Sequence, residues 1–163
     1  MQNKLNNLTN IQLSYLAGFL DAEGCILAQI VKGDYPYNFT IRLSVVFYQK
    51  TTKHWYFMYL KKLINLGDIK VKKDGMVEYG IFGVNLVENF LSKIFPYLVL
   101  KKALVILIFT IIKGLKNIKN KAHFIEVCKL VDKVAEYNCS KGRKITSLVV
   151  QNNLMLPVET KKF

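Results

Sequence analysis

Leu16-Ala17-Gly18-Phe19-Leu20-Asp21-Ala22-Glu23-Gly24 is the stretch that decides the fold. Its small residues, two carboxylates and final glycine suit the last two turns of a helix, with Gly24 at the C′ position. Asp21 and Glu23 would then lie where the helix dipole is negative, which ordinarily disfavours an acid. A cation bound at this end of the helix would remove that conflict.

The composition indicates a basic, single-domain protein. The 163-residue chain has 24 Lys and Arg against 11 Asp and Glu, a formal net charge of +13. This excess points to a nucleic acid or an anionic membrane surface as partner. The length suffices for one domain with a proper core. The abundance of Lys, Asn, Ile, Tyr and Phe is typical of an AT-rich gene, as many organellar genes are.

Local patterns disfavour two classes of protein. The longest apolar stretch, Ala103–Ile112, is well short of the roughly 20 residues that span a bilayer, so it predicts a buried helix. Cys25, Cys128 and Cys139 lack metal-ligand spacing, and the chain has only two histidines. A zinc site is therefore disfavoured, and we expect buried free thiols in a reducing compartment.

The periodicity predicts alternating helices and strands. Thr9 and Gln12 have capping-box spacing, so the first helix should run from Asn10 to Glu23. Residues 39–49 alternate with period two and predict a strand, paired as a hairpin with 25–32. Asp74-Gly75 predicts a second hairpin. Further helices are expected over residues 51–66, from Asn85 to Pro96, over 101–113 and over 121–137, followed by an irregular tail.

The alternation also assigns faces to these elements. On the second strand, one face carries Phe39, Ile41, Leu43, Val45 and Phe47, and the other carries Thr40, Arg42, Ser44, Val46 and Tyr48. In the same way, Lys70 and Lys72 face away from Ile69 and Val71. Of the helical residues, Trp55, Tyr59 and Leu63 share one side, and Leu86, Phe90 and Ile94 should be buried.

These elements together predict an α+β fold of order αββαββα with extra C-terminal helices, in which helices cover one face of a four-stranded antiparallel sheet. The uncovered face would carry Gln29, Thr40, Arg42, Ser44, Lys70 and Lys72. Polar and cationic side chains at alternate positions are what a β-ribbon uses to contact base edges in a major groove. An ordinary solvated sheet face has the same pattern, so both interpretations stay open.

With the helix and sheet in place, the chain resembles the LAGLIDADG homing endonucleases, and most closely their single-motif, homodimeric branch from organellar introns. Residues 16–24 match the family motif, with Glu23 in place of its final Asp and Ala22 in place of the preceding Gly. The resemblance covers about residues 9–145 of a single domain over 1–163, with 146–163 as a C-terminal tail.

The resemblance implies a homodimer with the two motif helices side by side. Gly18 and Ala22 are four residues apart, so they share a helical face and permit close approach of another helix, with Phe19 beside them. A monomeric enzyme would need a second motif about a hundred residues downstream, and the sequence contains none. One motif therefore implies a C₂ dimer.

The family also implies a set of catalytic residues. Glu23 and the Ala22 carbonyl would hold Mg²⁺, for which Mn²⁺ should substitute. Asp21 is the second-ranked acid of the site, after Glu23. Gln49 ends its strand where the family places a polar group that positions water. Lys53 and Lys101 match basic residues beside the scissile phosphate, Lys101 through the sequence Pro96-Tyr97-Leu98-Val99-Leu100-Lys101.

The implied partner is double-stranded DNA. The two β-ribbons of the dimer would cover on the order of 20 base pairs of a pseudo-palindromic target. Phosphate contacts are expected from a basic loop after the last long helix. The DNA-binding residues implied are Gln29, Lys32, Tyr35, Asn38, Thr40, Arg42, Ser44, Tyr48, Lys70, Lys72, Lys141, Arg143 and Lys144.

The expected activity is a site-specific, metal-dependent double-strand break by phosphodiester hydrolysis, within a chloroplast or mitochondrion. The first alternative is a maturase that binds intron RNA, or a non-cleaving nucleic-acid-binding module of the same fold. The second is an unrelated RNA-binding protein, which the lack of a surface stacking motif disfavours. A membrane protein is the least favoured alternative.

Overall fold

The computed structural model describes residues 4–138 and 143–155. Its sheet has the order β1-β2-β4-β3 with every neighbouring pair antiparallel, so the predicted αββαββα order is confirmed. The helices and strands are α1 (Asn10–Glu23), β1 (Gly24–Lys32), β2 (Phe39–Lys50), α2 (His54–Ile64), β3 (Asp68–Val71), β4 (Met76–Phe82), α3 (Val84–Ile94), α4 (Lys102–Lys116), α5 (Lys121–Tyr137) and α6 (Ser147–Met155). Short 3₁₀ turns lie at Lys4–Asn7, Thr51–Lys53 and Phe95–Tyr97.

Helix α1 begins as predicted and ends differently. Thr9 and Gln12 form a reciprocal capping box, in which each backbone N–H donates to the other side chain. Gly24 does not adopt the left-handed C′ conformation, because its φ of −90° and ψ of 151° lead directly into β1. A side chain here would collide with Leu20 and approach the Phe47 ring to 2.9 Å. Close packing therefore explains this glycine.

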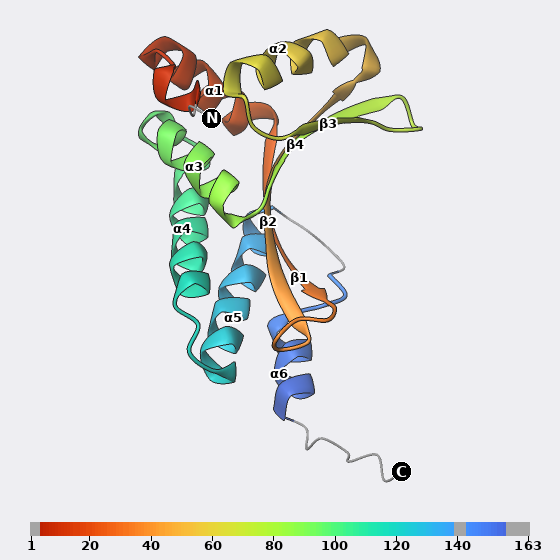
Figure 1. The fold of residues 1–163 in the computed structure, drawn as a ribbon, viewed down its shortest axis with the longest axis vertical. Coiled ribbons are helices and arrows are strands. Elements are labelled where there is room, and N and C mark those ends of the chain that lie inside the picture. The colour runs from red at the N-terminus through yellow and green to blue at the C-terminus, as the bar shows by residue number, and fades with distance from the viewer. Residues whose placement is uncertain (1–3, 139–142, 156–163) are drawn as a thin grey trace.

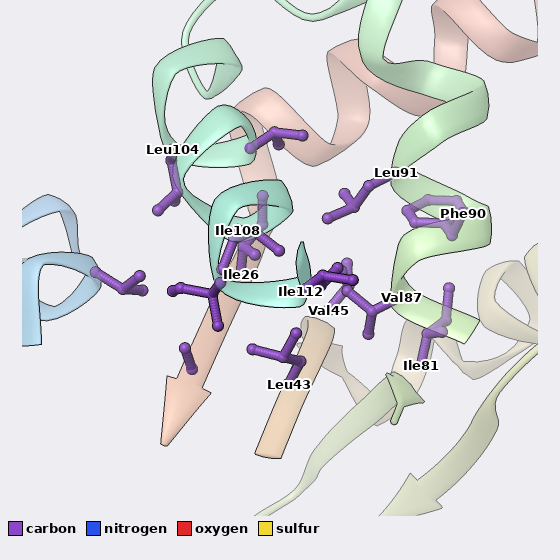
Figure 2. Close-up of a cluster of buried hydrophobic side chains, with 14 of the residues drawn as sticks. Ile26, Leu43, Val45, Ile81, Val87, Phe90, Leu91, Leu104, Ile108 and Ile112 are labelled. Atoms are coloured by element: carbon purple, nitrogen blue, oxygen red, sulfur yellow. The ribbon is translucent and has the colours of Figure 1, made fainter. Parts of the chain in front are cut away.

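One face of the sheet carries the hydrophobic core. Helices α3, α4 and α5 lie on the same side of the strands (Figure 1). Their apolar side chains meet those of the sheet, as in the cluster of Figure 2, where Val87 and Leu91 of α3 and Ile108 of α4 face Ile26 and Val45. Burial of these groups at about 25 cal/mol per Å² supplies the main stabilisation of the fold.

The predicted alternation of β2 is confirmed by its burial. All five residues assigned to the core face, from Phe39 to Phe47, are buried, while Thr40, Arg42 and Ser44 are partly or fully exposed. Val46 is the exception on the open face, since only 2% of it is exposed. The face opposite the helices is therefore polar with a local apolar feature.

Some predicted faces and bounds were wrong. Trp55 and Tyr59, predicted to share one side of their helix, lie on its exposed side, and α2 buries Phe57, Leu60 and Ile64. Leu86 is exposed, because α3 starts at Val84 and turns Val87 and Leu91 towards the sheet. Cys25 is an exposed free thiol on the open face, whereas Cys128 is buried as expected. Cys139 lies outside the described residues.

The tail contains a helix that the sequence pattern did not predict. Helix α6 packs against α5 and buries Val150. The Ser147 N–H at its start donates to the Asp132 carboxylate over 2.9 Å, which supplies an acceptor from α5 at the end of α6. Within the described residues, no helix combines the length and the apolar character needed to cross a bilayer.

Candidate active site and nucleic-acid interface

The carboxylate of Asp21 joins α1 to the start of α4. It accepts the backbone N–H groups of Val99, Leu100 and Lys101 over 2.8, 3.1 and 2.9 Å. Partial burial raises the pKa of Asp21, but these three hydrogen bonds outweigh it and hold the pKa below its usual value. Both carboxylate oxygens are thus occupied by the protein's own backbone.

Lys101 is held at the C-terminal end of α1. Its Nζ donates to the backbone carbonyl of Asp21 over 2.5 Å, and the residue is half-buried. The contact satisfies one carbonyl of the last helical turn. The positive charge of Lys101 therefore lies beside the backbone of Asp21, two residues before Glu23, although Lys101 itself is far from Glu23 in sequence.

The other predicted catalytic residues lie at the same end of the sheet. Glu23 is exposed at the last position of α1. Gly24 pairs with Phe47, two residues before the half-buried Gln49. Lys53 is exposed in the 3₁₀ turn that follows β2. The strand pairing thus brings Gln49 close to the end of the motif helix, and Lys53 follows it in the next turn.

One chain supplies only part of a metal site. Hard oxygen donors suited to Mg²⁺ are the Glu23 carboxylate and the last-turn carbonyls of α1, since Asp21 is already engaged. The Leu20 carbonyl accepts from Gly24 and the Asp21 carbonyl from Lys101, so the carbonyls of Ala22 and Glu23 are the remaining donors of this turn. No cluster of three or more His, Cys, Asp or Glu side chains occurs among residues 4–138 and 143–155. The donors fit Mg²⁺ only if phosphate, water or a second chain completes the shell.

The open face of the sheet brings together the predicted DNA-contacting residues. Gln29 pairs with Arg42 across β1 and β2, and Lys70 pairs with Glu78 of β4, which pairs in turn with Tyr48. The predicted set therefore shares one surface: Gln29, Thr40, Arg42, Ser44, Tyr48 and Lys70. Lys32, Tyr35 and Asn38 lie at the β1–β2 turn, where the Arg42 guanidinium donates to the Tyr35 hydroxyl over 3.1 Å.

Sequence reasoning missed Glu78, an acid on this basic face. The Lys72 ammonium lies 2.8 Å from the Glu78 carboxylate and 4.4 Å from the centre of the Tyr48 ring. Burial and the Glu78 charge raise the pKa of Tyr48, so its hydroxyl stays protonated. The period-two pattern of β4 could have placed Glu78 here. Lys72 is therefore oriented by protein groups before any DNA binds.

The basic loop differs in part from the prediction. Arg143 donates to the backbone carbonyls of Val131 and Ala28 over 2.9 and 2.8 Å, and Asn138 donates to that of Ile26 over 2.7 Å. These bonds cover the free edge of β1. Lys144 is exposed and available for phosphate, whereas Lys141 lies outside the described residues.

An unpartnered stripe runs along α1. Ile11, Tyr15, Gly18 and Ala22 are all exposed and recur at helical spacing, and 83% of Ile11 is accessible. A Cβ added at Gly18 would meet no atom of residues 4–138 or 143–155 within 4 Å. No contact within this part of the chain therefore explains a glycine that costs about 1 kcal/mol of helix stability relative to alanine.

Aromatic residues border this stripe. The Tyr15 and Tyr56 hydroxyls are 2.6 Å apart, and Tyr59 joins Ile11 and Tyr15 around a shallow hollow. Trp55 is 66% exposed nearby on α2, in edge contact with Tyr56. An exposed apolar surface of this kind marks a protein contact site.

Phe19 turns inward from the stripe. Its ring stacks on Phe47 at 5.0 Å and meets the edge of Tyr56 at 5.2 Å. Of the predicted interface residues, Gly18 and Ala22 thus face outward and Phe19 supports them from inside. Ile11, Tyr15 and Trp55 were missed, although the four-and-three spacing of α1 contained the first two.

Comparison with known proteins agrees with this geometry. The family model described as LAGLIDADG endonuclease matches residues 16–113. The DNA endonuclease I-CvuI of Chlorella vulgaris is 38% identical over 83% of this chain and 84% of its own length. The DNA endonuclease I-CreI of Chlamydomonas reinhardtii is 37% identical over 92% of this chain and 93% of its own.

Solved structures extend the match. The crystal structure of I-CvuI with the I-CreI target in 2 mM Mg, in which the DNA is not cleaved, has a TM-score of 0.83 and 36% identity, over 88% of this chain and 92% of that one. The archaeal intron-encoded homing endonuclease I-Vdi141I, complexed with DNA, has a TM-score of 0.76 and 21% identity, over 89% of this chain and 95% of that one. The chain therefore belongs to the LAGLIDADG endonuclease family. Both the resemblance and the endonuclease class predicted from the sequence are confirmed.

Proposed function

We propose that this chain acts as a homodimeric homing endonuclease that makes a metal-dependent double-strand break in a long, pseudo-palindromic DNA target. The observation that carries the proposal is the position of Glu23 at the end of the unpartnered stripe on α1. Packing two such stripes against each other would bring two Glu23 carboxylates and two sets of helix-end carbonyls together. A second copy would thus complete the donor set that one chain lacks.

The proposed metal ligands are the Glu23 carboxylate and the Ala22 carbonyl. When bound there, Mg²⁺ would supply an activated water and stabilise negative charge on the phosphate, and we expect Mn²⁺ to substitute. Structures of I-CvuI with DNA contain 2 mM Mg in one case and 2 mM Ca in another, which supports divalent-metal dependence. A cation would also offset the unfavourable placement of acids at the helix C-terminus.

The remaining residues act around this centre. The Lys101 ammonium, held beside the helix end, can stabilise charge on the cleaved phosphate, and Gln49 can orient water by hydrogen bonding. We assign Lys53 a phosphate contact. The hydrogen bonds of Asp21 support a positioning role, because its carboxylate fixes the backbone from which Lys101 extends.

The DNA would lie on the open face of the sheet. A net charge of +13 and the polar alternation of β1 and β2 support this placement. Exposed Lys144 can contact phosphate, whereas the geometry of Arg143 supports a role in holding the edge of β1. We further propose that the protein works in a chloroplast or mitochondrion. An amino-acid composition typical of an AT-rich gene, as many organellar genes are, supports this location.

A cleavage assay tests the proposal. The probe is a supercoiled plasmid library with randomised palindromic inserts of about 20 base pairs, together with the I-CreI target used to crystallise I-CvuI. We expect linear product with Mg²⁺ and none with EDTA. Glu23→Gln should abolish cleavage while binding in Ca²⁺ persists, and Glu126→Gln on the surface of α5 serves as the matched control. Tight binding to intron RNA without DNA cleavage would contradict the nuclease and support the maturase alternative.

A further inference from the structure

A small apolar cluster interrupts the polar face of the sheet. It consists of Leu27, Val46 and Phe82, from β1, β2 and β4. These residues occupy two neighbouring rungs, because Leu27 pairs with Ser44 and Ser44 with Phe82, while Val46 pairs with Gly80. They share this face with Arg42 and Gln29 and lie opposite the helices. The hydrophobic core therefore does not account for them.

The arrangement of the cluster depends on Gly80. A Cβ at this position would collide with the end of the Phe82 ring, so the ring extends from its own rung over the Gly80 backbone. Gly80 is the cross-strand partner of Val46, which is 2% exposed although none of the described helices α3, α4 and α5 of the core lies on this side. Phe82 itself remains 49% exposed. The result is an apolar platform with one accessible aromatic face.

The surroundings of the platform identify what it can contact. Phe82 borders a hollow of about 580 Å³ together with Gln29, Arg42 and Ser44. The polar side chains offer donors and acceptors, and the excess positive charge of the chain favours a polyanion. In a major groove, the one apolar group on a base edge is the C5 methyl of thymine, which Phe and other apolar side chains contact.

We propose that Phe82 and Leu27, supported by the buried Val46, recognise a thymine C5 methyl group at a base pair in the inner part of each half-site. The inner position follows from the strand register, because β1 starts at Gly24, directly after Glu23, and Leu27 is only three residues further. Gln29 and Arg42 lie one rung further out and would contact the adjacent pair. This inference rests on the proposed function, since it specifies which base the DNA-binding face selects.

Replacement of thymine by uracil tests the methyl group alone. A bound sequence is first selected from the randomised duplex library in Ca²⁺, and each thymine is then changed to deoxyuridine in turn. Loss of the buried methyl in one half-site should weaken binding about fourfold, and loss of the methyls in both half-sites should weaken it about fifteenfold. We expect this effect at one inner pair and no comparable effect at other thymines. Cytosine at that pair should bind weakly, and 5-methylcytosine should restore part of the affinity.

Variants link the effect to the cluster. Phe82→Ser should bind the thymine and uracil duplexes equally, and Phe82→Leu should retain part of the preference. Val71→Ser is the matched control, because Val71 is an exposed apolar residue on the other face of the β3–β4 hairpin. Thermal unfolding of each variant verifies that it is folded, and Val46→Thr provides a second test if Phe82→Ser does not fold.

The outcomes separate the two proposals. If no duplex is selected or cleaved, the proposed function fails. If a sequence is selected and cleaved but uracil replaces thymine everywhere without loss, or Phe82→Leu and Val46→Thr leave a thymine preference unchanged, the assignment of the cluster is wrong while the proposed function stands.

Discussion

Gly18 is the position at which the proposed dimer is most vulnerable. It is exposed on α1, and a Cβ added there meets no atom within 4 Å in the part of the chain that the structure describes. Gly18→Leu should therefore leave the isolated subunit folded, and should favour the helix by somewhat less than the roughly 0.8–1 kcal/mol by which alanine exceeds glycine. In a close helix pair the same side chain would overpack, at a cost of about 1–3 kcal/mol for each copy.

The two copies of the substitution double that cost at the dimer axis. We thus expect a loss of about 2–6 kcal/mol of association free energy, which is at least a thirtyfold weaker dimer. Sedimentation velocity at micromolar concentration measures the association, and circular dichroism measures the fold. Thr110→Leu places the same leucine side chain at an exposed position of α4, and this control variant should remain dimeric. The reasoning is refuted if Gly18→Leu sediments as the wild type does, or if the wild type is itself monomeric.

Three other perturbations separate structural from functional residues. Asp21→Asn should cost about 1–3 kcal/mol in urea unfolding at pH 7, because it removes an acceptor of three backbone N–H groups. Folding lowers the pKa of Asp21, so this stabilisation is present above the unfolded pKa of about 3.9 and is lost as the pH falls through the folded pKa. The free energies of unfolding of the variant and the wild type should therefore converge at low pH. A stability difference that persists there contradicts the assignment of Asp21. Arg143→Met should lower stability by a few kcal/mol, because its two bonds to carbonyls are charge-assisted. Lys144→Met should leave stability unchanged and reduce the salt slope of DNA binding by about 0.9 per subunit, or about 1.8 for the dimer. A reversed pattern would contradict both assignments. Maleimide at pH 8 should label exposed Cys25 but not Cys128, because burial raises the pKa of the Cys128 thiol to about 12. Bound DNA should protect Cys25 from labelling. Site-resolved mass spectrometry measures both, and labelled Cys128 or unprotected Cys25 would contradict the prediction.

Features determined by local sequence were predictable. The capping box of Thr9 and Gln12 depends on residues three apart, and the alternation of β2 depends on one strand facing helices on a single side. The motif residues around Glu23 also belong to one helix turn. For such features, a short window of sequence contains the physical cause.

Features determined by distant partners were not predictable. Arg143 donates to carbonyls 12 and 115 residues away in sequence, on α5 and β1, so its role in holding the edge of β1 had no local signal. Helix α6 has one buried residue, Val150, and takes an acceptor for its first turn from Asp132 of α5. Gly24 is required by close packing against Leu20 and against the Phe47 ring of β2, rather than by its own dihedral angles.

The central claim is that two copies of the chain place their Glu23 carboxylates at one metal-dependent site on DNA. A crystal structure of the protein with its selected duplex and Ca²⁺ tests this claim most directly, and Mn²⁺ in its place adds an anomalous signal. We predict two chains related by a two-fold axis, with a Glu23 oxygen of each about 2.3–2.6 Å from a Ca²⁺ ion. A single chain on the DNA, or metal ions bound without Glu23, would contradict it.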